Sequence, residues 1–241
     1  MNAMTIPETL PEGFRRIEWA YRRPRWRRMV QIVMLLASEG VSTVVELVRL
    51  MNIDNKSVHV ALNSMLDLLD PLVESFSFSA GAKGRIRVVT LTDYGKALAR
   101  ALGVEPVESD WEKIVRLHNG EVQTRHAAVV LMAAYQARLR GWKAEVMPFD
   151  PQETPWFQPD LKLTDPEGWF YYCEVETHSR VKPKKWARMR EVNLIVPTPT
   201  ARNWMVQRLR AMGIPGRATD LRTLAQQAKA GELSRFWLEK W

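Results

Sequence analysis

The chain has 241 residues, enough for one large or two small domains that each bury a core of their own. Its 35 Lys and Arg against 27 Asp and Glu give a formal net charge of +8, which favours an anionic partner, nucleic acid first and a membrane surface second. The single cysteine, Cys173, excludes an intramolecular disulfide and a cysteine-based zinc site, and no apolar run is long enough for a membrane span or a signal-peptide core. We therefore expect a soluble cytoplasmic protein of two domains.

Residues 1–26 are interpreted as a basic arm. The segment 14–28, FRRIEWAYRRPRWRR, is rich in arginine and contains a single acid, Glu18. Such a density of guanidinium groups favours contact with a phosphate backbone, so Arg22, Arg23 and Arg25 are predicted to bind DNA. The interleaved aromatic residues either stack on bases or pack on the neighbouring domain, and packing is the preferred interpretation.

Three helices, a hairpin and a fourth helix are predicted over residues 27–103. Apolar residues at helical spacing indicate helices over 27–40, 42–51 and about 58–69, with Ser42 or Thr43 as the cap of the second. Two alternating runs joined by the turn GAKG predict a β-hairpin, and Thr92 is expected to cap a helix that ends at Gly103.

This order of elements resembles a winged helix-turn-helix, and the segment LTDYGKALARALG is similar to the junction after the wing in many bacterial regulators. In that fold the third helix enters the major groove and the wing touches phosphate. The resemblance nominates for the groove Asn55, Lys56, Ser57, His59 and Asn63, and for the wing Lys83, Arg85 and Arg87. The alternative is that these are solvated surface residues, or that the domain binds protein or dimerises.

An acidic linker over residues 104–110 leads into a second domain over 111–241. The predicted elements are a helix over 121–140, a strand over 143–148, a hairpin around 166–168, a basic segment over 178–190, a strand over 193–197, a helix over 200–213 and a strand near 217–221. Strands that alternate with helices predict a mixed sheet with helices on its faces. The expected fold is thus an α+β first domain followed by an α/β second domain.

The predicted hairpin carries carboxylates at Asp160, Glu174 and Glu176. A three-residue turn with a proline first and a left-handed glycine third would place Asp160 opposite Glu174, with Glu176 on the same face. A four-residue loop would instead turn Asp160 to the other face. Opposed carboxylates are destabilising unless a cation or a shared proton lies between them, and Mg²⁺ or Mn²⁺ is the natural candidate. Cys173 would point to the opposite face and pack in the core.

Pro159-Asp160 and Glu174-Val175-Glu176, within an αβββαβ order, resemble the signature of PD-(D/E)XK nucleases. The resemblance implies that Asp160 and Glu174 bind the metal, and that Glu176 stands where the family has a lysine that activates water. Further candidates from the neighbouring elements are Glu121, His126, Lys162, Lys184 and Lys185. Their simpler interpretations are a helix-terminal acid, an interior histidine, a lysine toward the turn and a solvated basic face.

The whole layout, with His126 early in a helix and then PDLKL and FYYCEVETHSR, is similar to the replication-relaxation family of plasmid and mobile-element proteins. This similarity implies DNA binding in replication or transfer control. Three functions stay open: a non-catalytic DNA-binding regulator with a nuclease-like second domain, a Mg²⁺-dependent DNA endonuclease, and a protein-recruitment module whose tail RFWLEKW docks another subunit. DNA is the expected partner in the first two and a protein in the third, and a palindromic DNA target would imply a homodimer.

Overall fold

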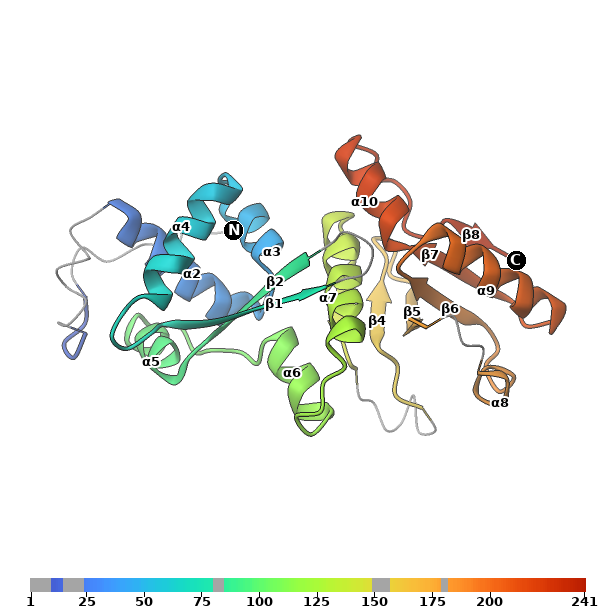
Figure 1. The fold of residues 1–241 in the computed structure, drawn as a ribbon, viewed down its shortest axis with the longest axis horizontal. Helices are drawn as coiled ribbons and strands as arrows, with labels where there is room; N and C mark the ends of the chain where they lie inside the picture. Colours follow the sequence, from blue (N-terminus) through green and yellow to red (C-terminus); the bar gives the residue numbers. More distant parts are fainter. Residues whose placement is uncertain (1–9, 15–23, 80–84, 149–156, 179–181) are drawn as a thin grey trace. The chain divides into compact units, whose positions relative to one another are not determined.

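The computed structural model describes residues 10–14, 24–79, 85–148, 157–178 and 182–241 (Figure 1). They divide into two compact units, one formed mainly by Met1–Phe78 and Ile86–Lys113 and the other mainly by Ile114–Trp241. Three of the predicted DNA-binding residues, Arg22, Arg23 and Lys83, lie outside the described residues. Within the described residues, no helix has both the length and the apolar character needed to cross a membrane.

The first unit consists of helices and a two-stranded sheet. Its elements are α2 (Pro24–Glu39), α3 (Val44–Met51), α4 (Asn55–Leu66), β1 (Val73–Ser79), β2 (Arg85–Leu91) and α5 (Asp93–Ala101), and α6 (Asp110–Leu117) follows. Two predicted caps are confirmed, because the Thr43 and Thr92 side chains accept the amide hydrogens of Glu46 and Gly95. The third predicted helix begins earlier than expected, at Asn55, because Asp54 caps it.

The core of the first unit lies between its helices. Ile32, Leu47, Leu62 and Leu98 come from four different helices and are fully buried together. The expected arm boundary at residue 26 falls inside a helix, since α2 begins at Pro24 and the Trp26 side chain is buried in this core. The preferred interpretation of packing is therefore confirmed for this aromatic residue.

The second unit contains a mixed six-stranded sheet with helices around it. Its elements are α7 (Thr124–Leu139), β3 (Lys143–Val146), β4 (Leu161–Thr164), β5 (Phe170–Val175), α8 (Pro183–Trp186), β6 (Val192–Val196), α9 (Pro199–Ala211), β7 (Gly216–Asp220), α10 (Leu221–Lys229) and β8 (Glu239–Lys240). The strands lie in the order β3-β4-β5-β6-β7-β8, with β5, β6 and β7 parallel to one another and the other pairs antiparallel. The expected mixed α/β sheet is confirmed.

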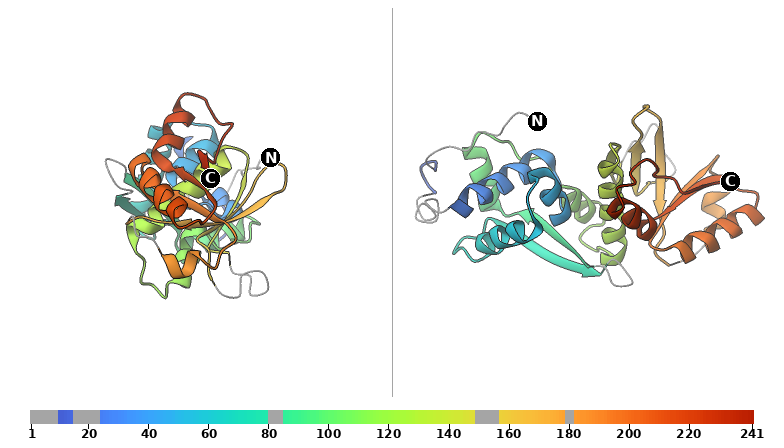
Figure 2. Two further views of the ribbon diagram at one scale, coloured as in Figure 1. Left: turned by 90° about the vertical axis from the view of Figure 1, so that its right-hand side faces the viewer. Right: turned by 90° about the horizontal axis from the view of Figure 1, so that it is seen from above.

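The sheet has helices on both faces (Figure 2). On one face Leu194 and Ala218 pack with Met205 and Leu209 of α9. The other face is covered by α7, which packs along β3, β4 and β5, and α10 lies against α7 and β7. Since Glu174 pairs with Leu194 in register, its side chain is expected on the α9 face of β5.

The hairpin register predicted from the turn is confirmed. Leu161 pairs with Cys173, and the Asp165 amide donates to the Trp169 carbonyl at 2.9 Å. Gly168 has a φ of +94°, the left-handed conformation that the three-residue turn requires. The Asp165 carboxylate also accepts from the Trp169 amide at 2.9 Å, which fixes the turn from within.

The C-terminal tail belongs to the second unit's own sheet. β8 pairs with β7, the Trp241 amide donates to the Gly216 carbonyl at 3.1 Å, and Phe236 is buried. The aromatic residues that suggested docking to another subunit are thus engaged within the chain, so this tail no longer supports the recruitment hypothesis.

Candidate functional site

The three carboxylates of the hairpin region lie close together in the second unit. Asp160 precedes β4, and its Oδ2 accepts the Val175 amide hydrogen at 2.7 Å, which ties it to the neighbouring strand. Glu174 and Glu176 are buried at the end of β5. The extended register therefore brings Asp160 and Glu174 together as predicted, with Glu176 two positions further on.

Each carboxylate contacts a basic side chain of the same unit. The two Glu174 carboxylate oxygens each accept from the Lys185 Nζ at 2.7 Å. Lys182 forms an ion pair with Glu176, and His126 Nε2 lies 2.9 Å from Asp160 Oδ1. These partners were not predicted from the sequence: Lys185 was expected to follow phosphate or to face solvent, and His126 was a candidate accessory residue.

The electrostatics of the cluster differ from one carboxylate to the next. Burial, together with the charge of Asp160, raises the pKa of Glu174 to about 7, although Lys185 opposes the rise. Burial alone would lower the pKa of His126, but the hydrogen bond and charge of Asp160 outweigh it and raise this pKa above its usual value. The pKa of Lys182 is likewise raised by Glu176 against the effect of its burial. Pairing thus favours the charged forms of His126 and Lys182, while burial still disfavours charge on Glu174.

The carboxylates do not form a ready metal site in this arrangement. Oxygen ligands are what Mg²⁺ and Mn²⁺ prefer, yet the two oxygens of Glu174 are occupied by Lys185 and those of Asp160 by His126 and a backbone amide. Among the described residues, no group of three or more His, Cys, Asp and Glu side chains is placed to hold a metal ion. The lysine ammonium groups lie where the sequence predicted a divalent cation.

The other residues predicted near this site have varied positions. Glu121 is exposed and precedes α7, which begins only at Thr124, so it does not start that helix as expected. Lys162 Nζ lies 4.9 Å from the Phe170 ring centroid, and Lys184 is exposed on α8. Cys173 is fully buried, and burial with the nearby carboxylate charges raises its thiol pKa well above the usual value. It packs in the core, as predicted.

A polar surface on α4 collects most of the described residues that were predicted to bind DNA. Asn55, Lys56 and Asn63 are exposed on this helix, and Ser57 and His59 are half-buried. Arg25 of α2 donates to Ser64 of α4 at 3.2 Å, which adds a guanidinium group beside the helix. We call this surface of α4 and Arg25 the α4 face.

Arg87 of β2, which was predicted to be a wing residue that touches phosphate, is held against α4. Its guanidinium group contacts His59 Nδ1 at 2.8 Å, Asn63 Oδ1 at 3.0 Å and Ser75 Oγ at 2.7 Å. Since arginine only donates, His59 Nδ1 is the acceptor, and burial followed by the Arg87 charge lowers the pKa of His59. Arg87 therefore orients the His59 and Asn63 side chains of the α4 face.

Comparisons with known proteins give only distant similarity to solved structures. No family model and no curated protein matches the chain. Among solved structures, the restriction endonuclease FokI is similar with a TM-score of 0.26 and 10% sequence identity, over 85% of this chain and 44% of that chain. The chain thus spans less than half the length of FokI. A TM-score this low assigns neither fold nor function, so the similarity to replication-relaxation proteins stays a prediction from motifs.

Proposed function

We propose that this protein binds DNA through a winged helix-turn-helix in its first unit and carries a nuclease-like second unit. The observation that supports the proposal is the α4 face, where exposed amide side chains suited to base edges lie beside basic side chains suited to phosphate. Asn55, Lys56 and Asn63 would face the groove, and Arg25 and Arg85 the backbone. Arg87 would keep Asn63 in place.

Salt-dependent binding to duplex DNA tests this proposal. Each phosphate contact contributes about 0.9 to the slope of log affinity against log salt concentration, so an Arg25→Ala, Arg85→Ala double variant, which removes the two proposed backbone contacts, is expected to lower the slope by about two. Arg100→Ala is the matched control, because Arg100 lies on α5 and donates to Glu105 at 3.1 Å. Fluorescence anisotropy with labelled duplexes measures both. An unchanged slope in the double variant, or an equal loss in the control, would contradict the proposal.

Metal-dependent DNA cleavage is a second candidate function, and the hairpin register supports it because Asp160 and Glu174 lie side by side. Binding of a divalent cation there requires Lys185 to leave Glu174, since it occupies both oxygens. Nicking of supercoiled plasmid with Mg²⁺ or Mn²⁺, beside an Asp160→Ala, Glu174→Ala variant, tests this. Cleavage by the native protein alone would establish a nuclease. No cleavage, with DNA binding intact, would favour the hypothesis of a non-catalytic DNA-binding regulator.

The similarity to the replication-relaxation family carries the rest of the proposal, a role in replication or transfer control of a plasmid or other mobile element. It depends on the predicted order of the two domains and on the short motifs around His126, Asp160 and Glu174. A test is whether deletion of the protein in a plasmid host changes plasmid copy number or transfer frequency. Unchanged values for both would contradict this part and leave the DNA-binding proposal intact.

A further inference from the structure

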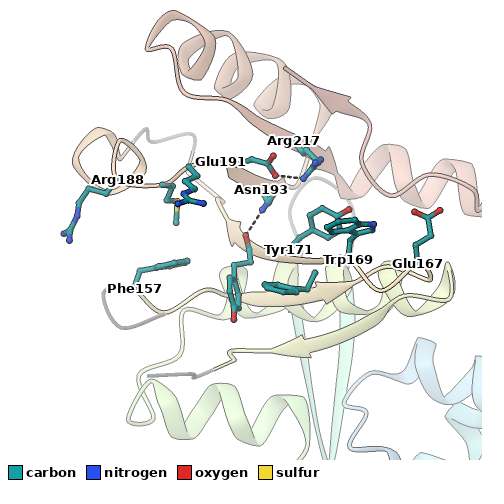
Figure 3. Close-up of a pocket in the computed structure, with 12 residues that line it drawn as sticks. Phe157, Glu167, Trp169, Tyr171, Arg188, Glu191, Asn193 and Arg217 are labelled. Atoms are coloured by element: carbon teal, nitrogen blue, oxygen red, sulfur yellow. Dashed lines mark hydrogen bonds and ion pairs between the residues drawn. The ribbon is translucent and has the colours of Figure 1, made fainter. Parts of the chain in front are cut away.

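An open groove of about 1010 Å³ lies in the second unit where β5, β6 and β7 begin (Figure 3). Its walls combine aromatic rings with arginines, and it is at the upper end of the roughly 300–1,000 Å³ of small-molecule pockets. The lining side chains used below are Phe157, Trp169, Phe170, Tyr172, Arg190 and Arg217. None of them was assigned a role by the motifs or by the carboxylate cluster.

Large aromatic surfaces of the groove are left in water. Trp169 and Phe170 directly follow the tight turn of the hairpin, and their exposed fractions are 69% and 52%. Phe170, Tyr172 and Phe157 form a row of rings, with centroids 5.5 Å apart for the first pair and 6.3 Å for the second. Exposed aromatic rings gathered in one groove indicate a binding surface, because a flat ligand that covers them removes apolar area from water and lowers the free energy.

Positive charge accompanies these rings. The groove contains three arginines against two glutamates. Lys162 lies 4.9 Å over the Phe170 ring, and Lys185, which is also paired with Glu174, lies 5.4 Å over the Phe157 ring. Arg217 lies 4.9 Å over the Tyr171 ring and pairs with Glu191, while Arg190 lines the groove and is exposed. A ligand that suits both features has flat rings and negative charge.

We propose that this groove binds unpaired bases of single-stranded DNA, by stacking on Trp169 and Phe170 while the basic side chains attract the phosphates. Bases in a duplex are paired and stacked on one another and do not offer free faces, so the groove would favour single strands. The choice of DNA as the polymer rests on the proposed function. Along β5, Phe170, Tyr172 and Glu174 alternate onto one face, so the bases would bind on the face that leads along the strand toward the carboxylate cluster.

The test is the affinity of the full-length protein for a fluorescein-labelled oligothymidylate of about a dozen nucleotides. Because stacking contributes about 1–3 kcal/mol per base, a Trp169→Ala, Phe170→Ala variant is expected to bind the oligonucleotide at least about tenfold more weakly and duplex DNA unchanged. Both residues are exposed, so the fold should survive, and circular dichroism checks this. Trp204→Ala is the matched control, since Trp204 is an exposed tryptophan under the Arg208 guanidinium group on α9.

The outcomes separate this inference from the proposed function. Native affinity in the double variant, or an equal loss in the Trp204→Ala control, overturns the groove assignment. Lys56→Ala should weaken duplex binding and leave the oligothymidylate affinity unchanged. Duplex binding without any single-strand binding overturns the inference alone, whereas single-strand binding without duplex binding overturns the proposed function alone. Tighter binding of oligouridylate through the same rings would replace DNA by RNA as the ligand.

Discussion

Glu174→Gln is expected to stabilise the protein in mildly alkaline solution. The Glu174 side chain is only 3% exposed. Its burial and the charge of Asp160 raise the pKa of its carboxyl group from 4.5 to about 7. Since a pKa unit corresponds to roughly 1.4 kcal/mol, this rise corresponds to about 3 kcal/mol of stability lost when the group is ionised in the folded state. Glutamine resembles the protonated acid and still offers an oxygen to the Lys185 ammonium.

The sign of the pH dependence follows from the raised pKa. Below pH 4.5 the carboxyl group is protonated in both the folded and the unfolded chain, so its full stability is present there. Between 4.5 and about 7 the unfolded chain releases its proton first, and the free energy of unfolding falls with rising pH. The gain from Glu174→Gln should therefore be near zero at pH 4.5 and reach about 3 kcal/mol above pH 7.

Urea unfolding followed by circular dichroism at both pH values measures this gain. Val175→Ala, which removes a buried methyl pair next to Glu174, identifies the transition of the second unit if the two units unfold separately. Glu167→Gln is the matched control, because Glu167 is exposed in the hairpin turn. A Glu174→Gln variant that is less stable than the native protein above pH 7, or equally stabilised at both pH values, would refute the reasoning.

Three further predictions concern the same two units. Arg87→Met is expected to raise the pKa of His59, measured from its NMR titration, because one cause of its lowered pKa is removed; an unchanged pKa would contradict the contact. Cys173 should resist a thiol reagent such as DTNB in the folded protein and react fully in urea, because its buried thiol has a raised pKa; fast native reaction would argue against this burial. Lys185→Ala should strengthen Mn²⁺ binding in calorimetry by freeing two carboxylate oxygens, whereas Lys184→Ala should not; equal affinities would mean that no competition exists.

The hairpin register could be predicted from the sequence because local turn chemistry determines it. Pro166 and Gly168 select a three-residue turn, and from there alternation assigns every side chain of β4 and β5 to a face. The helix caps Thr43 and Thr92 were equally readable, since capping involves only the next three residues. Features fixed within a few residues of the chain are those that the sequence predicted.

Other elements were missed for different reasons. The start of α6 has a recognisable sequence pattern, because Ser109 and Glu112 exchange hydrogen bonds as a capping box. The acidic, proline-containing stretch before it was instead interpreted as a linker. The two-residue strand β8 exists only because it pairs with β7, and no local pattern marks it. Contacts with distant parts of the chain determine this strand, and they likewise determine that Lys182 and Lys185 turn toward the carboxylates.

Lys182 and Lys185 are the partners of the carboxylates that could not be predicted from the sequence. The sequence indicated that the carboxylates converge and that a cation or a shared proton must relieve their repulsion, and Lys182 and Lys185 supply positive charge here. It could not specify the cation, because the loop after β5 determines whether lysines of the same chain reach the carboxylates. A buried strand acid followed closely by a basic segment was the available signal, and it favours an internal ion pair as much as a metal.

The paired lysine does not fully offset the burial of Glu174, and this imbalance argues that the acid has a function. Lys185 contacts both oxygens at 2.7 Å, yet the pKa is still raised to about 7, so the charged carboxylate is a net cost to folding. An amide at this position, which still accepts a hydrogen bond from Lys185, would give a more stable fold above pH 7. Ionisable groups held at such a cost are concentrated at functional sites. In the proposed complex, a base stacked on Phe170 would share one face of β5 with Glu174, so the charge of this acid would lie along the path of the bound strand.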